Sequence, residues 1–487
     1  MPSFYIKTNR VFTIIRKYGF IFTLAVAIGG LWYPRLGLLV IPVMIGLMLY
    51  SFFKGRFWCG NICAHGSLFD SLLMPISRNK KIPKFFKSKA LGIVFFILFS
   101  YKLISKFIKV AALYGTASYF DKIGMIFVSS YLMVTIVGGL LAITVSPRTW
   151  CNFCPMGFLQ KMSYKLGKKA GVTKITDEKI TASKTEMCHK CGKCARVCPM
   201  QLTPYTQFSD KNQFDHEACI RCSTCVENCP AGILTLTNET TACVMEENID
   251  IKGYENRQKI QSRIENIRNL KDDTIEYTFK FIKPEKVDYE AGQFILVKIQ
   301  DNPEMYRAYS ISSYNEDGTS VSVTIKKMSH GYGTNMIFEN FKVGDLVQLE
   351  GPMGRELVVD KENEKILLVG GGIGITPFIP IVTDLIENEN NVKDVKLIYG
   401  ANYENDFIYL DEFEKLSDGS DKFELVQVVA FDDKWKGEKG FVTDYMKKLD
   451  LDGYKIYMCG PKPMINASMK TLKDLDVNKK NIYYESA

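Results

Sequence analysis

Three long stretches without a charged residue limit how this 487-residue chain can fold. They cover residues 18–34, 36–53 and 123–145. At about 1.5 Å per residue, each is about long enough to cross the roughly 30 Å hydrocarbon core of a bilayer as a helix. A weaker fourth stretch covers residues 90–105, and Lys102 interrupts it only near its end, where a lysine can reach the interface. We therefore expect residues 1–170 to form an α-helical membrane bundle of about four helices.

Lysine and arginine residues flank these stretches unevenly. They precede the first stretch and crowd between residues 54 and 89, whereas the link between the first two stretches holds only Arg35. The positive-inside rule then places the N-terminus and residues 54–89 in the cytoplasm, and four crossings return the chain to the cytoplasm at Arg148. With a net charge of +9, this pattern favours a membrane surface over nucleic acid as a partner. We expect a multi-pass protein of the inner, cytoplasmic membrane whose later domains are cytoplasmic.

The chain has 14 cysteines, many of them in two compact clusters. The first cluster is CHKCGKCARVCP at residues 188–199, and the second is CIRCSTCVENCP at residues 219–230. Both read C-x2-C-x2-C-x3-C-P. Clustered cysteines of this kind argue against a secreted disulfide scaffold and indicate metal sites in a reducing compartment. Iron–sulfur clusters are favoured, and zinc is the alternative.

This pattern resembles that of the bacterial two-cluster ferredoxins, in which three cysteines of one motif and the last cysteine of the other bind each cluster. The resemblance predicts an α+β two-cluster ferredoxin domain at residues 171–245. It implies two [4Fe–4S] clusters, one on Cys188, Cys191, Cys194 and Cys229 and one on Cys219, Cys222, Cys225 and Cys198.

Two further cysteine pairs lie at the cytoplasmic ends of predicted membrane helices. Cys59 and Cys63 follow Arg56-Phe-Trp, and Cys151 and Cys154 follow Arg148-Thr-Trp. Each pair precedes a glycine and an apolar helix start, so the two segments look like an internal repeat. Thiolates from two facing helix ends could together hold one iron–sulfur cluster. A redox dithiol and a zinc site are the alternatives.

These pairs resemble the C-x3-C-P motifs of the polyferredoxin-like membrane proteins in the electron-supply systems of nitrate and nitrous-oxide reductases. The resemblance implies a third cluster at the membrane face. This sequence departs from the family pattern twice: Ala64 stands in place of the proline after the first pair, and the spacing of the second pair is shortened. The sequence leaves open whether these thiolates hold a cluster.

Residues 252–360 read as short strands after a charged, helix-like stretch at 253–269. The apolar segments TIEYTFKFI, GQFILVKIQ, YRAYSISS and SVSVTIKKM are separated by turn residues, which predicts an antiparallel β-barrel. In residues 361–487, strand-like segments such as ILLVGGG, VKLIYGA and KIYMCGP alternate with helical or loop segments. That alternation predicts a parallel, doubly wound α/β domain.

A glycine run follows the first of these later strands and opens a helix. It contains Gly370, Gly371, Gly372 and Gly374, and it leads to Thr376 and Pro377. We expect Thr376 to be the N-cap and Pro377 the first helical residue. Such a turn directs backbone N–H groups and the helix dipole at a pyrophosphate, so the glycines and Thr376 are candidate nucleotide-binding residues.

Several motifs in residues 252–487 resemble those of the ferredoxin–NADP reductase superfamily. The segment Tyr306-Arg307-Ala308-Tyr309-Ser310 matches the R-x-Y-S signature of that family. The resemblance implies that Arg307 neutralises the phosphates of FAD, that Tyr309 stacks on the isoalloxazine, and that Ser310 hydrogen-bonds near its reactive nitrogen. The family's second phosphate-binding turn matches Gly331, Gly333 and Thr334.

Two further matches complete the resemblance. Cys459-Gly460-Pro461 matches the C-G-P motif, whose cysteine lies beside the nicotinamide, and Glu485 matches an acidic residue often found close to the flavin. The resemblance thus implies Ser310, Cys459 and Glu485 as catalytic candidates. Asn402 stands where NADP-dependent relatives often have a basic residue, which favours NADH and leaves NADPH open.

Together these parts predict a multidomain, membrane-anchored oxidoreductase with domains at residues 1–170, 171–245, 252–360 and 361–487. NAD(P)H would give a hydride to FAD, and single electrons would then pass through the [4Fe–4S] clusters toward the membrane cysteines. The expected acceptor is a quinone or a flavoprotein subunit, in the membrane or beyond it. The rival readings are a non-enzymatic conduit or assembly subunit, a reductase of soluble acceptors, and a reverse flow that reduces NAD(P). The sequence does not fix the acceptor, the direction or the oligomeric state.

Overall fold

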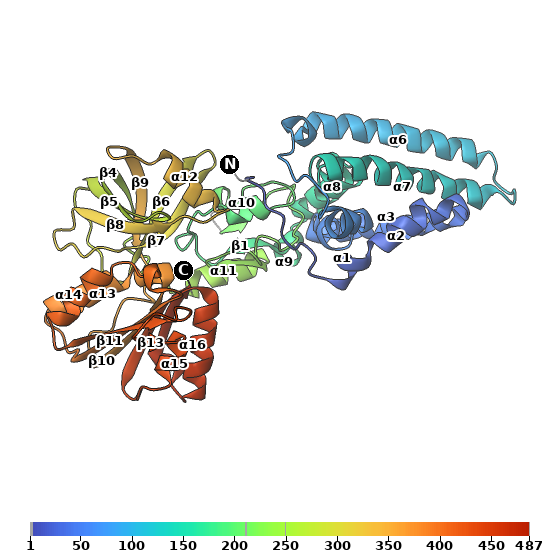
Figure 1. Cartoon of the computed structure of the whole chain (residues 1–487). Coiled ribbons are helices and arrows are strands. Elements are labelled where there is room, and N and C mark those ends of the chain that lie inside the picture. Colours follow the sequence, from blue (N-terminus) through green and yellow to red (C-terminus); the bar gives the residue numbers. More distant parts are fainter. Residues whose placement is uncertain (1–2, 210–211, 249, 487) are drawn as a thin grey trace. The chain divides into compact units, whose positions relative to one another are not determined.

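The computed structural model describes residues 3–209, 212–248 and 250–486, and the chain divides into two compact units (Figure 1). The N-terminal unit consists of Ser3–Cys188 together with Gly192–Asp250. The C-terminal unit consists of His189–Cys191 and the chain from Ile251 onward. Each unit has its own core, and each is described by itself.

Four helical segments of the N-terminal unit are long and apolar enough to cross a membrane. The first, Ile14–Leu31, contains α1 (Ile14–Tyr18) and α2 (Phe20–Ala27), and the second, Pro34–Lys54, ends in α3 (Val40–Lys54). The third and fourth are α6 (Lys89–Ala111) and α7 (Tyr119–Thr144). The weak stretch at 90–105 thus covers most of a longer helix, from its second residue onward. The orientation of these segments in a membrane stays a prediction.

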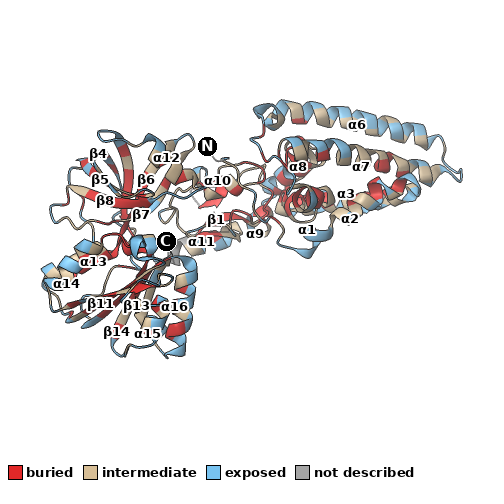
Figure 2. Ribbon diagram, viewed as in Figure 1, coloured by how far each residue is buried: buried red, intermediate tan, exposed pale blue. Residues whose placement is uncertain are grey.

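Helix α6 shows most plainly why these helices need an apolar surrounding. In its most apolar window only 6% of the residues are buried, although Ile93, Ile97 and Leu98 are large hydrophobic residues. Figure 2 shows the exposed and intermediate surface that runs along this helix. In water such a surface would carry a large hydrophobic penalty, whereas in lipid it carries none.

Short helices follow the second and fourth segments in equivalent places. After α3 come α4 (Phe57–Asn61), α5 (Ala64–Ser67) and a π-helical turn, Leu68–Leu73. After α7 come a 3-10 turn, Trp150–Asn152, then α8 (Pro155–Lys169) and α9 (Thr173–Thr176). Cys63 is the N-cap residue of α5, and Cys154 is the N-cap residue of α8. This equivalence agrees with the internal repeat that the sequence predicts.

The remainder of the N-terminal unit is a small α+β fold around a three-stranded antiparallel sheet of order β2-β1-β3. Its strands are β1 (Lys179–Ala182), β2 (Gln213–Phe214) and β3 (Leu234–Thr237), and its helices are α10 (Lys193–Val197) and α11 (Glu239–Asn248). Ile180, Phe214 and Ile233 pack in one core with Cys194 and Cys225, so both cysteine motifs are tied to this sheet.

The first half of the C-terminal unit is a six-stranded antiparallel sheet of order β7-β6-β9-β4-β5-β8. Its strands are β4 (Gln258–Lys271), β5 (Thr274–Lys283), β6 (Phe294–Asp301), β7 (Glu304–Ser310), β8 (Ser320–Lys326) and β9 (Leu346–Met353). An isolated bridge between Ile311 and Val323 links β8 to the residue after β7. Closure into a full barrel stays a prediction. Helix α12 (Tyr332–Asn340) lies between β8 and β9 in the chain.

The helix-like interpretation of residues 253–269 is wrong, because β4 occupies most of this stretch. The charged residues that suggested a helix surface are the exposed half of a strand. Ile260, Ser262 and Ile264 are buried and alternate with exposed neighbours, which is the two-residue period of a half-buried strand.

The second half of the C-terminal unit is a six-stranded parallel sheet of order β13-β12-β11-β10-β14-β15. Its strands are β10 (Lys365–Gly371), β11 (Asp394–Ala401), β12 (Phe423–Val429), β13 (Glu438–Lys439), β14 (Tyr454–Gly460) and β15 (Ile482–Ser486). The helices are α13 (Phe378–Glu387), α14 (Leu410–Asp418), α15 (Val442–Met446) and α16 (Lys462–Asp474).

Alternate residues of the central strand enter two separate cores. Ile366 and Leu368 pack with residues of α13 and α14, whereas Leu367 and Val369 pack with residues of α15 and α16. Helices therefore cover both faces of the sheet, as expected for a doubly wound fold.

Candidate functional site

The glycine run lies at the carboxyl end of β10, where the loops after β11 and β14 also meet. Gly371 and Gly372 line a cavity of about 610 Å³ together with Gly400, Asn402 and Pro461. In open parallel sheets, ligands bind in the crevice outside the carboxyl ends of the strands. The place and the lining of this cavity therefore fit a nucleotide.

Close backbone approach explains two of these glycines. A Cβ atom on Gly374 would lie 2.4 Å from the carbonyl oxygen of Cys459, and one on Gly371 would lie 2.4 Å from the sulfur of Met464. Gly372 has a φ of +56°, in the left-handed region that glycine tolerates best. The run therefore folds back against the end of β14.

Thr376 is not the N-cap that the sequence predicts. A 3-10 turn, Gly372–Ile375, already has a helical backbone, and Thr376 continues it with φ −57° and ψ −39°. The N-cap residue of α13 is Pro377, and the first helical residue is Phe378. The early turn makes Thr376 helical and buries it, so its hydroxyl is not used as a cap.

Cys459 and Glu485 lie opposite each other on the neighbouring strands β14 and β15. The Cys459 side chain is buried, and burial, followed by the charge of Glu485, raises the pKa of its thiol. Burial, and then the nearby Glu356, raises the pKa of Glu485 from 4.5 to about 7. The structure thus brings these two candidates together at the end of the sheet where the glycine run lies.

Strand β7 carries the three residues of the predicted flavin signature, Arg307, Tyr309 and Ser310. A Cβ atom on Gly333 would lie 2.6 Å from Nε of Arg307, so the first turn of α12 rests directly on this guanidinium group. The hydroxyl of Thr334 accepts a hydrogen bond of 3.2 Å from the backbone N–H of Met328 and closes the turn that contains Gly331. A helix start beside an arginine is a suitable cradle for a phosphate.

Cysteines of the two ferredoxin-type motifs lie near one another in the N-terminal unit, and their pairing into two clusters stays a prediction. Burial, followed by the charges of Cys222 and then Cys219, raises the pKa of Cys198 to about 12, and the backbone N–H groups of Leu202 and Met200 point at its sulfur. Cys188 and Cys229 pack on the core that contains Cys194 and Cys225. Amide donors around grouped sulfurs fit iron–sulfur clusters. Cys191 belongs to the other unit, and its role as a ligand stays a prediction.

The two membrane cysteine pairs meet in one cavity of about 130 Å³. All four thiols line it, and Cys59 and Cys151 are buried within its walls. The sulfur of Cys63 accepts a hydrogen bond from a backbone N–H at Gly66, and that of Cys154 accepts bonds from Met156 and Gly157. The arrangement fits a group held by four thiolates, with amide donors on two of them.

Two arginines at this cavity each donate hydrogen bonds to both cysteine pairs. Arg56 donates to the sulfur of Cys59 at 3.6 Å and to the carbonyl oxygen of Cys151 at 2.9 Å. Arg148 donates to the sulfur of Cys151 at 3.6 Å and to the carbonyl oxygen of Cys59 at 3.0 Å. Each arginine therefore contacts its own cysteine and also the other half of the repeat. A Cβ atom on Gly157 would lie 2.9 Å from Arg56, and one on Gly66 would lie 2.6 Å from Arg148.

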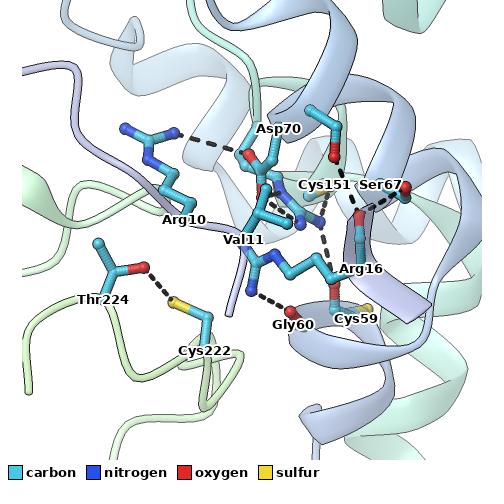
Figure 3. A network of polar contacts seen from close by, with 12 residues as sticks. Arg10, Val11, Arg16, Cys59, Gly60, Ser67, Asp70, Cys151, Cys222 and Thr224 are labelled. Atoms are coloured by element: carbon cyan, nitrogen blue, oxygen red, sulfur yellow. Dashed lines mark hydrogen bonds and ion pairs between the residues drawn. The ribbon is translucent and has the colours of Figure 1, made fainter. Parts of the chain in front are cut away.

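A single buried carboxylate anchors this network (Figure 3). Asp70 accepts a hydrogen bond of 2.6 Å from Arg148, is bonded to Arg16, and lies 3.7 Å from a nitrogen of Arg10. Burial alone would raise the pKa of Asp70, but the three guanidinium groups hold it well below its usual value. Sequence reasoning missed Asp70, Arg10 and Arg16. The repeated Arg-x-Trp-Cys pattern was the available signal for Arg56 and Arg148.

The second ferredoxin-type motif, at residues 219–230, packs directly against the segment that carries Cys59. A Cβ atom on Gly60 would lie 1.9 Å from the carbonyl oxygen of Ile220 and 3.3 Å from Cβ of Cys222. Cys59, Cys151 and Cys222 belong to one buried core. The second predicted cluster and the membrane cavity are therefore neighbours within one unit.

Gly60→Ala should disturb this junction, because the added methyl group must displace the backbone at Ile220. We expect the free energy of unfolding to fall by about 1–3 kcal/mol, seen as a lower thermal midpoint of the full chain in detergent. Gly92→Ala is the matched control, since a Cβ atom there meets nothing within 4 Å. Equal midpoints for the two variants would contradict the close contact.

Glu485 should make stability depend on pH. Its pKa lies above its ordinary value, so the folded state binds the proton more tightly and loses stability as the pH rises from 4.5 to about 7. Glu485→Gln removes this loss, so its thermal midpoint should rise relative to that of the parent between about pH 5 and pH 8, by the equivalent of about 1–3 kcal/mol. A difference that stays constant over this range would show that Glu485 titrates normally.

Comparison with known families gives four matches. Residues 368–470 match the oxidoreductase NAD-binding domain, and residues 261–356 match the oxidoreductase FAD-binding domain. Residues 187–234 match the 4Fe-4S dicluster domain. The 4Fe-4S binding domain matches twice, at residues 36–83 and 129–173, which are the two halves of the membrane repeat.

Two relatives each align with less than half of this chain. The toluate 1,2-dioxygenase electron transfer component of Pseudomonas putida is 31% identical over 227 residues, which are 46% of this chain and 66% of that protein. The propane 2-monooxygenase reductase component of Mycolicibacterium smegmatis is 27% identical over 237 residues, which are 47% of this chain and 68% of that protein. The chain thus spans about two thirds of the length of these relatives.

Among solved structures, a ferredoxin reductase in carbazole 1,9a-dioxygenase matches with 28% identity and a TM-score of 0.43, over 47% of this chain and 69% of its own. The domain assignment rests on the family matches and on the two sheets. The chain therefore contains the FAD-binding and NAD-binding domains of the ferredoxin–NADP reductase superfamily, together with 4Fe–4S domains of the ferredoxin type.

Proposed function

We propose that the protein is a membrane-anchored oxidoreductase that passes electrons from NAD(P)H through FAD and [4Fe–4S] clusters to an acceptor in or beyond the membrane. The observation that carries the proposal is the shared core of Cys59, Cys151 and Cys222. A domain that only anchors the chain in a membrane needs no cysteines, and it has no reason to pack cysteines against a ferredoxin-type motif. Two relatives are an electron transfer component and a reductase component, which supports the same direction of flow.

The domains follow as residues 1–170 for the membrane bundle, 171–245 for the two-cluster ferredoxin, 252–360 for FAD and 361–487 for NAD(P). The apolar spans and the basic residues that flank them support a multi-pass protein of the cytoplasmic membrane with the later domains in the cytoplasm.

FAD, when bound, accepts a hydride and releases electrons singly. Arg307 and the turn with Gly331, Gly333 and Thr334 would hold its phosphates, because that turn rests on the guanidinium group. Tyr309 would stack on the ring, with Ser310 near the reactive nitrogen. These two residues end β7 and are only partly buried, which leaves their side chains accessible to a ligand.

The nucleotide would bind over Gly370, Gly371, Gly372 and Gly374, with Thr376 behind them and Gly460 and Pro461 beside them. Cys459 and Glu485 would face the reacting end, since both lie where β14 and β15 end. Asn402 lines the cavity and offers no positive charge to a 2′-phosphate, so we favour NADH over NADPH.

The charge of the membrane cavity supports a third [4Fe–4S] cluster on Cys59, Cys63, Cys151 and Cys154. Arg56 and Arg148 are buried in its wall, and Arg10 and Arg16 are buried next to Asp70. Within the described part of the chain, Asp70 is the one carboxylate that pairs with Arg10, Arg16 and Arg148, and Arg56 pairs with none. Such a cluster with its thiolates is a dianion, and it gains a further negative charge on reduction. Neutral thiols or disulfides would leave the buried cations uncompensated, which is costly.

Zinc on the same thiolates would also be a dianion, so charge alone does not separate the two alternatives. In residues 3–209, 212–248 and 250–486, no group of three or more His, Cys, Asp or Glu side chains is arranged to hold a single metal ion. This holds for the ferredoxin motifs as well, where the family match indicates iron–sulfur clusters. The twofold match to the 4Fe-4S binding domain supports the same assignment at the membrane pairs.

Replacing Cys59 and Cys63 together with alanine tests the proposal. We expect iron to fall from about twelve to about eight atoms per chain, because only the ferredoxin pattern remains. NADH-dependent reduction of a soluble dye should persist, whereas reduction of the membrane acceptor, assayed with a quinone analogue, should stop. Cys243→Ala is the matched control, since Cys243 is exposed and lies outside every motif.

Single replacement of the less buried Cys63 guards against a folding defect in the double variant. Unchanged iron and unchanged quinone reduction in both variants would remove the membrane cysteines from the path. A parent protein that reduces no dye with either nicotinamide would overturn the enzymatic function itself.

A further inference from the structure

A second pocket of the N-terminal unit, of about 230 Å³, lies between the start of α6 and the first turns of α8. Its wall has a cationic part and an apolar part. The cationic part consists of Arg56, Lys87, Lys89, Lys161 and Lys165, and the apolar part includes Ile93, Phe158 and Met162. Its lining also includes Cys151 and Cys154 of the membrane cavity, but the proposed electron path assigns no role to its lysines or to its apolar part.

Positive charge in this pocket exceeds negative charge. Glu217 is the one acidic residue in its wall, and it lies 3.8 Å from Lys165. Lys87 donates to the carbonyl oxygen of Gln201 at 3.0 Å, which leaves its charge unbalanced. Burial, and next the charge of Arg56, lowers the pKa of Lys161 to about 8. The site therefore gathers like charges that an anion would stabilise.

The start of α6 adds to this positive potential. The helix has 23 residues, and its N-cap residue, Ser88, makes no side-chain hydrogen bond to the first turn. No acidic residue lies in that turn, and Lys89 is there instead. Both features oppose the usual preference for capping groups and negative charge at a helix start.

One N–H group of a buried arginine, which does not bond the membrane cysteines, gives a further sign of a missing hydrogen-bond acceptor. Arg56 is 2% exposed and lines the pocket, and its Nε has no hydrogen-bond partner among the described residues. A buried guanidinium N–H without a partner is costly, so such groups are nearly always satisfied in folded proteins. The pocket has open space at Gly92, another of its lining residues, because a Cβ atom there would meet nothing within 4 Å.

We propose that this pocket binds the phosphate diester of an acidic phospholipid headgroup. The cations and the helix start would hold the phosphate, and the apolar wall would accommodate the beginning of an acyl chain. Ile93 and Met162 are 44% and 50% exposed, and Ile97 continues the apolar surface along α6, which is a candidate membrane span. Basic pockets at the cytoplasmic ends of membrane helices bind such headgroups through this chemistry. Inorganic phosphate is also an anion, but it has no acyl chain that could contact the apolar wall.

The test uses the full chain in detergent and native mass spectrometry, with phosphatidylglycerol and phosphatidylcholine as probes. We expect retention of phosphatidylglycerol in preference to phosphatidylcholine, and no displacement by an excess of inorganic phosphate. Lys89→Gln and Lys161→Gln should each weaken the affinity for phosphatidylglycerol by about fivefold. Lys109→Gln, at the opposite end of the same helix, should leave it unchanged.

Three results would overturn the proposal. Equal retention of both lipids would show adhesion to the apolar surface alone. Displacement of the lipid by inorganic phosphate would assign the pocket to the free ion. Equal affinities in the Lys161→Gln variant, the Lys109→Gln variant and the parent would place the lipid elsewhere. NADH-to-dye activity and the thermal midpoint, measured in the same samples, verify that each variant is folded.

Discussion

The excess of buried positive charge around the membrane cysteines is the constraint on which the rest of the N-terminal unit depends. Asp70 draws Arg10, Arg16 and Arg148 together, and so ties the N-terminal arm to both halves of the repeat. A lone carboxylate cannot neutralise so many guanidinium groups, and buried charges need partners. The proposed anionic cluster on the thiols would offset part of this charge, and its reduction would offset more.

Close packing then determines where electrons can enter. Gly60 lets the loop at Ile220 and Cys222 rest on the helix that carries Cys59, and no larger residue fits there. In the other unit, a glycine without a side chain, Gly374, likewise lets the glycine run pack against the end of β14, beside Cys459. If the proposed cofactors occupy these sites, both junctions would bring them near each other, because the backbones that carry the assigned residues touch there.

Local patterns in the sequence predicted the FAD-binding, NAD-binding and 4Fe–4S domains that the family matches confirm, and the four apolar helical segments. These patterns are local: cysteine spacing, uncharged runs and the order of short motifs can each be recognised within a short segment. They could therefore be identified without a structure. Thr376 was placed wrongly because a 3-10 turn begins the helical backbone early. The prediction of a helix-like stretch at 253–269 was wrong because it relied on the charged residues. It overlooked the two-residue alternation that includes Ile260 and Ile264, which is typical of a strand. Asp70 and Arg10 could not be found, since their roles come from packing between segments far apart in the chain.

The most direct test of the account is the low-temperature EPR spectrum of the full chain after anaerobic addition of NADH. The account predicts bleaching of the flavin and signals from three reduced clusters, one of which is lost when Cys59 and Cys63 are replaced. A bleached flavin with the same cluster signals in the parent and in that variant would contradict it, because the membrane cysteines would then hold no cluster that NADH can reduce.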